Sequence, residues 1–343
     1  MNFASDNGSG AAPEVLAAVV AANPGFARSY GADALSARVR DQVRHLFEAP
    51  EAEVFLVATG TAANALSIAL CAPPWSAVLL HEDAHAMQDE CGAPEFFSGG
   101  AKLVGLSGPH GKILPETLAA ALARLGESGV HGVQRGMLSL TNLTEAGTVY
   151  APAEIAALTA QARAWGLPVH LDGARLANAL VATGATPAEM TWRAGIDVLS
   201  LGGSKNGCLG VEAVVLFDPA KAWELQLRRK RAGHLFSKHR FLAAQMAAYL
   251  TDGLWLRLAA QANAMGARLA QGLARVPGAR LLHPTPANML FALLAPGTNA
   301  RAQSRGAVYY PVPAPQGQDA ARLVASWSTT PDDVDALIAA LMP

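Results

Sequence analysis

The chain has 343 residues, of which 51% are hydrophobic and 15% charged, which is enough apolar material for a large core and predicts two lobes. Its 26 lysines and arginines nearly balance 27 acidic residues, and a formal charge of −1 gives no general attraction to nucleic acid or to an acidic membrane surface. We therefore expect a small-molecule partner, with no nucleic acid, no membrane and no metal ion.

The cysteines and the start of the chain indicate the compartment. Cys71, Cys91 and Cys208 are scattered, show no Cys-x-x-Cys spacing and leave an odd number. The first residues are neither basic nor hydrophobic, and no uninterrupted apolar run reaches the length of a membrane span. These features predict a cytoplasmic protein.

The first predicted elements are two helices, 13–22 and 33–48, joined by a loop that carries Tyr30. A strand at 53–58 follows, and Gly60-Thr61 then opens a further helix. Free backbone N–H groups at the start of that helix suit a phosphate. An ordinary N-capped helix after a glycine turn explains the same residues.

Strand-like runs recur over the first two thirds of the chain, separated by stretches of helical composition such as 115–125 and 153–165. This alternation predicts an α/β domain with a largely parallel, seven-stranded sheet and helices on both faces. The predicted strands are 53–58, 77–81, 102–106, 136–140, 169–172, 196–201 and 211–217.

After Phe241 the composition changes to long Ala- and Leu-rich helices, then to short strands and a last helix from Asp332. This predicts a smaller α+β domain at 246–343, joined through helix to a large domain at 1–245. The predicted strands of this lobe are 280–282, 288–293 and 321–327. Arg322 lies inside the last of them, and a buried guanidinium needs an anionic partner.

Two reactive side chains follow neighbouring predicted strands. Asp172 closes one strand and Lys205 follows the next. If both strands are parallel, the two side chains meet at the carboxyl edge of the sheet, where open α/β sheets bind ligands. Pyridoxal phosphate uses such a pair, because its aldehyde forms a Schiff base with a lysine and its protonated pyridine nitrogen needs a carboxylate. A surface lysine and a helix-capping aspartate are the alternative interpretation.

Basic side chains elsewhere could serve an anion. Arg175, three residues after Asp172, can offer two parallel donors to a carboxylate. The basic cluster from Arg228 to Arg240 is typical of a solvated face, although part of it could reach an anionic cofactor.

With these motifs assembled, the sequence resembles the threonine aldolase family of fold-type I pyridoxal-phosphate enzymes, and in particular its bacterial low-specificity L-threonine (phenylserine) aldolases. The resemblance covers nearly the whole chain. Its landmarks are Phe-Ala-Ser-Asp-Asn at 3–7, Tyr30-Gly31, Gly-Thr-Ala-Ala-Asn at 60–64, Ala-His at 84–85, Asp-Glu-Cys-Gly-Ala-Pro-Glu-Phe-Phe at 89–97, His-Leu-Asp-Gly-Ala-Arg at 170–175 and Gly-Gly-Ser-Lys-Asn-Gly at 202–207.

The resemblance implies an aspartate aminotransferase-like large domain and reversible cleavage of threonine, allo-threonine or phenylserine to glycine and an aldehyde. It implies that Lys205 forms the Schiff base and that Asp172 holds the pyridine nitrogen. The other implied roles are the phosphate cup for Gly60 and Thr61, stacking on the cofactor ring for His85, and substrate-carboxylate binding for Ser5, Arg175 and Arg322.

Two further assignments concern the reaction and the assembly. His131 is expected near the substrate hydroxyl, with His85 mainly as the stacked ring, although His85 could instead be the base. By the resemblance, Tyr30 binds substrate and a basic residue such as Lys230 binds the cofactor, both from a neighbouring subunit, commonly of a homotetramer. Arg175 is also expected to contact the cofactor. Another fold-type I reaction, such as β-elimination, transamination or a transaldolase reaction, needs the same lysine and aspartate. A non-enzymatic pyridoxal-phosphate sensor is a further alternative.

Overall fold

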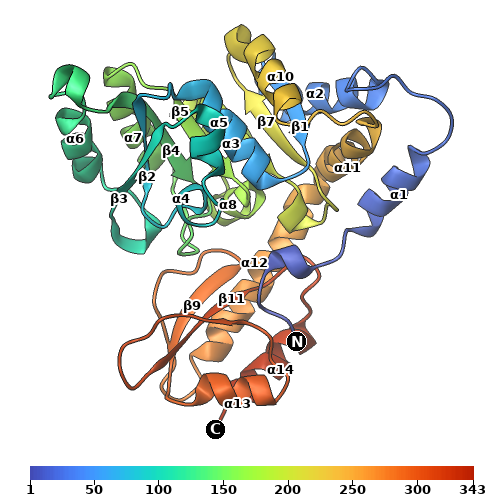
Figure 1. The fold of residues 1–343 in the computed structure, drawn as a ribbon. Helices are drawn as coiled ribbons and strands as arrows, with labels where there is room; N and C mark the ends of the chain where they lie inside the picture. The colour runs from blue at the N-terminus through green and yellow to red at the C-terminus, as the bar shows by residue number, and fades with distance from the viewer.

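The structure, a computed structural model, describes residues 1–343 and consists of two lobes connected by a long helix, α12 (Figure 1). The upper lobe of the figure contains a seven-stranded sheet in the order β1-β7-β6-β5-β4-β2-β3. β7 runs antiparallel to its two neighbours, and the other pairs are parallel. The predicted mostly parallel sheet is therefore confirmed. Its strands are β1 (Glu53–Val57), β2 (Ser76–His81), β3 (Lys102–Leu106), β4 (Gln134–Thr141), β5 (Val169–Gly173), β6 (Val198–Gly202) and β7 (Glu212–Leu216).

Helices cover both faces of this sheet because its strands are apolar on both sides. Two consecutive residues of β2 show this, since Val78 packs with the core under α3 and α10 while Leu79 packs with the core on the opposite face. The helices of this lobe are α1 (Pro13–Ala21), α2 (Ala34–Leu46), α3 (Gly60–Cys71), α4 (His85–Gln88), α5 (Ala93–Ser98), α6 (Pro115–Arg124), α7 (Pro152–Ala164), α8 (Leu176–Thr183), α9 (Pro187–Met190), α10 (Ala222–Arg231) and α11 (Arg240–Leu250).

The lower lobe is built on a four-stranded antiparallel sheet in the order β10-β11-β9-β8. The strand predicted at 321–327 is shifted, because β11 pairs residue by residue with β9 and ends at Val324, opposite Met289. The elements of this lobe are α12 (Leu254–Leu273), β8 (Arg280–Leu281), β9 (Met289–Leu294), α13 (Thr298–Ser304), β10 (Tyr310–Pro311), β11 (Asp319–Val324) and α14 (Pro331–Leu341).

The two cores meet along α12. Trp255 near its start belongs to the core of the large lobe, and Leu269 belongs to that of the small lobe. The predicted division at residue 246 falls inside α11, one helix before this passage. The N-terminal segment joins the small lobe, because the backbone N–H of Phe3 donates to Val308 and that of Val324 donates to Phe3. This brings the next residues of the segment between the lobes.

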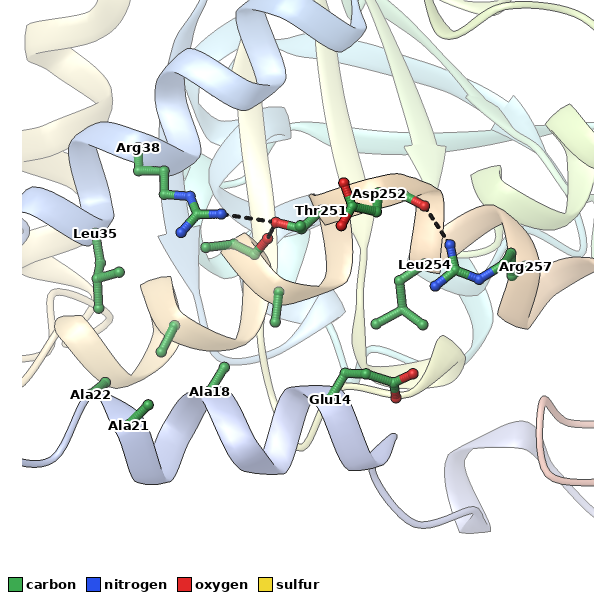
Figure 2. Close-up of a pocket in the computed structure, with 13 residues that line it drawn as sticks. Glu14, Ala18, Ala21, Ala22, Leu35, Arg38, Thr251, Asp252, Leu254 and Arg257 are labelled. Atoms are coloured by element: carbon green, nitrogen blue, oxygen red, sulfur yellow. Dashed lines mark hydrogen bonds between the residues drawn. The ribbon is translucent and has the colours of Figure 1, made fainter.

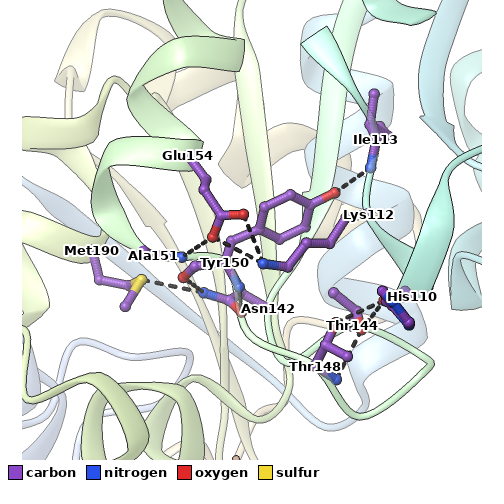
Figure 3. A network of polar contacts seen from close by, with 10 residues as sticks. All are labelled: His110, Lys112, Ile113, Asn142, Thr144, Thr148, Tyr150, Ala151, Glu154 and Met190. Atoms are coloured by element: carbon purple, nitrogen blue, oxygen red, sulfur yellow. Dashed lines mark hydrogen bonds and ion pairs between the residues drawn. The ribbon is translucent and has the colours of Figure 1, made fainter. Parts of the chain in front are cut away.

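The loop that follows β4 is fastened by a polar network (Figure 3). The side chain of Asn142 spans it, donating to the carbonyl of Tyr150 and accepting from the N–H of the same residue, each at 3.1 Å. Thr148 donates to the carbonyl of His110 at 2.7 Å. These bonds hold the turn between residues 144 and 148, which carries Glu145 toward the space between the lobes.

None of the helices combines the length and the apolar composition that crossing a membrane requires.

Candidate active site

The register of the sheet brings four strand ends to one edge. Asp172 of β5 lies opposite Ser200 of β6, and Gly202 at the end of β6 lies opposite Glu212 of β7. Val57, the last residue of β1, also lies opposite Glu212. Neighbouring strands are about 4.8 Å apart. The residues that follow β1, β5 and β6 therefore share one small region.

Lys205 is carried by a short 3₁₀ turn, Ser204–Asn206, directly after β6. Glu212 holds this turn by accepting from the N–H groups of Gly203 at 2.7 Å and Ser204 at 3.3 Å. Burial raises the pKa of Glu212 to about 6, while those N–H groups and Lys205 act in the opposite direction. Side chains do not fit at the two glycines before the turn. A Cβ on Gly202 would lie 2.2 Å from the carbonyl oxygen of Ala174.

Asp172, the next-to-last residue of β5, has a buried carboxylate that accepts two hydrogen bonds. Its Oδ2 accepts from Nδ2 of Asn64 at 2.8 Å, and its Oδ1 accepts from the N–H of Ala174 at 3.0 Å. Asn64 comes from the second turn of α3. Both bonds fix the carboxylate plane at the sheet edge.

The start of α3 lies at the same edge, just after β1. Thr59 caps the helix by accepting from the N–H of Ala62 at 3.1 Å, which leaves the N–H groups of Gly60 and Thr61 outside the helical ladder. A Cβ added to Gly60 would meet nothing within 4 Å, so there is open space beside it. Unbonded N–H groups at a helix start favour an anionic group.

His85 begins α4 and faces Glu90. Its Nδ1 lies 2.9 Å from Oε1 of Glu90, whose side chain is 0% exposed, whereas the histidine side chain is 32% exposed. The hydrogen bond to Glu90 is the main reason that the pKa of His85 is raised above its usual value.

Arg175 and Asp6 form a buried ion pair. Nε and Nη2 of Arg175 donate to the two carboxylate oxygens of Asp6, and the side chains are only 4% and 2% exposed. Burial would raise the pKa of Asp6, but the guanidinium of Arg175 brings it below the usual value. Asn288 from the small lobe also donates to Asp6, at 3.2 Å.

Arg322 of β11 approaches from the small lobe and has no carboxylate partner. Its one hydrogen bond goes from Nη1 to the carbonyl of Ala4 at 3.2 Å. Burial and the nearby Arg175 lower the pKa of Arg322. A half-buried guanidinium without a counter-ion is well suited to bind a carboxylate from solution.

A cavity of about 400 Å³ opens between the lobes, and several of these side chains line it. A carboxylate that was not assigned from the sequence, Glu145, also lines it, as does Phe291. The sequence-predicted members are Ser5, His85, Arg175, Lys205 and Arg322.

The structure does not bring His131 to this cavity in its own chain, so its expected position near the substrate stays a prediction. His131 is exposed and precedes β4, at the amino end of that strand. The eight-residue strand runs for roughly 23 Å from Gln134 to Thr141, the neighbour of Asp172, and His131 precedes its far end. Of the two histidines, only His85 lies at the site of its own chain.

Tyr30 and Lys230 lie together away from the cavity, with the lysine Nζ 4.9 Å from the centre of the tyrosine ring. Tyr30 lines a separate polar pocket beside α2 and β1, together with Arg229. Both Tyr30 and Lys230 are exposed. Neither contacts the cavity of its own chain.

Four polar residues that support the site were not assigned a role from the sequence. Asp6, Asn64 and Glu90 stand inside the motifs named above, but a motif does not show which distant side chain each one meets. A lone acid in the apolar run 211–217 was the available signal for Glu212.

Residues 2–295 match the family model described as beta-eliminating lyase. A low specificity L-threonine aldolase from Pseudomonas aeruginosa is 43% identical over 95% of this chain and 93% of its own length. A protein of the same description from another Pseudomonas strain is 41% identical, with the same coverage of both chains.

Solved structures share the fold. The threonine aldolase of Leishmania major superposes with a TM-score of 0.93 at 30% identity, over 99% of this chain and 98% of its own. A serine palmitoyltransferase from Sphingomonas wittichii superposes with a TM-score of 0.74 at 17% identity, over 99% of this chain and 86% of its own, which is a likeness of fold alone.

Proposed function

The chain belongs to the beta-eliminating lyase family, among its threonine aldolases, and on that premise we propose that it is a pyridoxal-phosphate-dependent aldolase. The substrates are L-threonine, L-allo-threonine and related β-hydroxy amino acids such as phenylserine, and the products are glycine and an aldehyde. The observation that carries the proposal is that Asp172 and Lys205 lie at one edge of the large sheet, while the unpaired Arg322 of the small lobe lines the same cavity as Lys205.

The residues at this edge fit the cofactor. Lys205 offers an amine, Asp172 a fixed carboxylate for a pyridinium nitrogen, and the start of α3 offers free N–H groups with open space at Gly60. The aldehyde-bearing cofactor supplies an electron sink that makes the Cα–Cβ bond of a bound amino acid breakable. Gly60 and Thr61 would hold its phosphate.

The substrate carboxylate is assigned mainly to Arg322 and Ser5. Arg322 has donors free, and Ser5 lines the same cavity. Arg175 also lines it, but two of its nitrogens are used by Asp6. Its remaining Nη1 can add one hydrogen bond, while its main task is to keep the N-terminal segment in place.

The proton acceptor for the substrate hydroxyl is His85. It is the histidine that lines the cavity, and its Nδ1 is engaged by Glu90 while Nε2 has no partner in the chain. A neutral imidazole with a free ring nitrogen accepts a proton near working pH. The same ring can also stack on the cofactor, either directly or with a water between Nε2 and the hydroxyl.

A second reaction deserves comparison because the matching family is described as beta-eliminating lyases. β-Elimination uses the same lysine and carboxylate, but releases ammonia and a keto acid. Transamination would also give a keto acid, and a transaldolase reaction would pass the glycine unit to a second aldehyde. Product analysis with threonine and phenylserine distinguishes them, since the proposal requires glycine and aldehyde in equal amounts.

The proposal includes assembly into a homotetramer in the cytoplasm, with Tyr30 and Lys230 completing the site of a neighbour. Both side chains are exposed and lie outside their own cavity. The surface nearby is apolar, since Val20 is 72% exposed and Phe26 is fully exposed. Between α1 and α11 it is hollowed into a pocket lined by alanines, including Ala18 (Figure 2). Apolar surface of this kind is typical of subunit contacts.

A further inference from the structure

A buried carboxylate, Glu90, lies between two assigned residues, His85 and Asp172. Its Oε1 accepts from Nδ2 of Asn64 at 2.8 Å and lies 2.9 Å from Nδ1 of His85. The same amide nitrogen of Asn64 donates to Oδ2 of Asp172 at 2.8 Å. A continuous hydrogen-bond network therefore connects the histidine at the cavity with the carboxylate at the sheet edge.

The network fixes the position of the hydrogen on His85. The amide nitrogen of Asn64 can only donate, so Oε1 of Glu90 is an acceptor. The other oxygen of Glu90, Oε2, is buried without a partner, so a proton on this carboxyl group would reside there. The hydrogen of the His85–Glu90 bond therefore belongs to Nδ1, and Nε2 is the free nitrogen of the neutral ring.

The surroundings of the pair act in both directions on the pKa of each group, and on His85 the hydrogen bond to Glu90 is the largest influence. Burial is the largest influence on Glu90 and raises its pKa, as does Asp172, while His85 and Asn64 lower it. The hydrogen bond from Glu90 is the largest influence on His85 and raises its pKa. Burial and Lys205 lower the pKa of His85, and Glu145 raises it. An acceptor that stabilises the protonated imidazole makes the free nitrogen a stronger base.

We propose that Glu90 is a positioning residue that holds His85 in the Nδ1–H tautomer and strengthens Nε2 as a proton acceptor. This rests on the proposed aldolase function, in which the β-hydroxyl proton passes to Nε2. The electron pair of that O–H bond becomes the second bond of the aldehyde carbonyl, and the Cα–Cβ pair remains with the glycine carbon. Glu90 does not line the cavity, so it acts through the side chains that it holds, which are His85 and, by way of Asn64, Asp172.

Two variants separate the charge of Glu90 from its hydrogen bond. Glu90→Gln keeps an oxygen that can accept from both His85 and Asn64 but removes the negative charge. Glu90→Leu removes the acceptor as well. The matched control is Glu82→Gln, an exposed carboxylate just before α4. Thermal unfolding of each holoenzyme identifies any variant that does not fold.

The direct measurement is nitrogen NMR of the imidazole of His85 in the holoenzyme, with its signals identified by their loss in His85→Phe. We expect the wild type and Glu82→Gln to show the Nδ1–H tautomer. Glu90→Gln should keep this tautomer with a lower pKa for His85, and Glu90→Leu should lose the single tautomer. An unchanged tautomer and pKa in both Glu90 variants overturns the inference.

Steady-state rates give the second readout. We expect kcat to fall roughly 10-fold in Glu90→Gln and roughly 100-fold in Glu90→Leu, with KM within about threefold of the wild type. In Glu90→Gln the acid limb of the pH–rate profile should move to lower pH. If kcat is the same in the wild type and both Glu90 variants although the NMR signal of His85 changes, Glu90 has no role in the reaction.

The aldolase function and the role of Glu90 would be rejected by different results. If the wild type releases no glycine and aldehyde from any β-hydroxy amino acid, the proposed function is wrong, and the NMR measurement still decides whether Glu90 controls His85. If the wild type is an aldolase and His85 titrates identically in every variant, only the role of Glu90 is rejected.

Discussion

The guanidinium of Arg175 and the carboxylate of Asp6 form a two-pronged ion pair, with N–O distances of 2.7 and 2.9 Å, across 169 residues of sequence. The pair ties the N-terminal segment to the end of β5 and occupies donors that could otherwise bind a substrate. It also buries both charges, so the loss of either partner leaves the other uncompensated.

We expect Asp6→Asn to lower the free energy of unfolding by about 3–5 kcal/mol, as is typical when one member of a buried pair is removed. The control is Asp335→Asn, which breaks the exposed pair with Arg268, 53% and 46% exposed respectively. It should cost about 1 kcal/mol or less. Denaturant unfolding measures both, and equal losses would show that Asp6 contributes no more than a surface partner.

The pH dependence of the same variant follows from the lowered pKa of Asp6. Because the folded state binds the proton of this group more weakly than the unfolded state, the ion pair stabilises the protein above the unfolded pKa. That contribution is lost as pH falls through the folded pKa. Below about pH 4, the stability of Asp6→Asn should therefore fall less steeply with acid than that of the wild type. Parallel curves would exclude the pair as a source of acid sensitivity.

The assignment of the substrate carboxylate to Arg322 predicts an effect on binding. Arg322→Leu should raise KM roughly 10- to 100-fold, because a hydrogen bond to a charged group contributes about 1.5–3 kcal/mol. Arg280→Leu, at an exposed position in β8 of the same four-stranded sheet, is the control and should leave KM unchanged. A KM shift in the control but not in Arg322→Leu would remove Arg322 from the site.

Substitutions of Lys205 and Asp172 should have different effects on cofactor binding and on rate. Lys205→Ala should lose the visible absorption band of the lysine-bound cofactor together with turnover, whereas the exposed Lys102→Ala should keep both. Asp172→Asn should still bind cofactor but lose rate by roughly 100- to 1,000-fold, because a neutral amide no longer stabilises a pyridinium proton. Borohydride reduction and rate assays measure these effects, and a near-normal rate in Asp172→Asn contradicts its assignment.

The sequence predicted the strands and the placement of Asp172 and Lys205 because both follow from short-range pattern and from one rule about the carboxyl edge of parallel strands. The same rule assigns His131, which precedes β4, to the opposite edge of the sheet in its own chain. The partner of Arg175 could not be predicted, because no local pattern shows that the N-terminal segment returns to β5.

The roles of the buried carboxylates Glu90 and Glu212 also could not be predicted from local sequence patterns. Glu90 stands in a recognisable motif, yet its role depends on three segments, the starts of α3 and α4 and the end of β5, meeting in space. Glu212 could have been found as a lone acid in an apolar strand, but its partners are the N–H groups of a turn that the sequence did not specify. The roles of both side chains therefore depend on tertiary contacts, which the local sequence does not show.

The shared-site proposal can be tested by mixing inactive chains. In a hybrid of Lys205→Ala with Lys230→Ala, the Lys230→Ala chain keeps its own Lys205 and receives Lys230 from its neighbour. Random pairing in dimers should then restore about a quarter of the sites. Sedimentation should show that the chains have exchanged. If Lys230 acts within its own chain, exchange will occur without recovery of activity.

The last prediction concerns His170, which is fully buried in β5 between Ser139 and Ser200, with both ring nitrogens 2.9 Å from a serine hydroxyl. Burial lowers the pKa of His170 to about 4, although the charge of Asp172 acts against this shift. A histidine whose folded pKa is below its unfolded value of about 6.5 is held neutral by the fold. The neutral form of His170 therefore stabilises the protein above the unfolded pKa, and this contribution is lost as pH falls from about 6.5 toward 4.

The variant His170→Gln can still form hydrogen bonds with both serines, but its side chain cannot titrate. It should be less stable than the wild type at neutral pH, and the difference should shrink over this range. Unfolding titrations at several pH values measure the difference, and one that stays constant with pH would show that His170 does not titrate differently on folding.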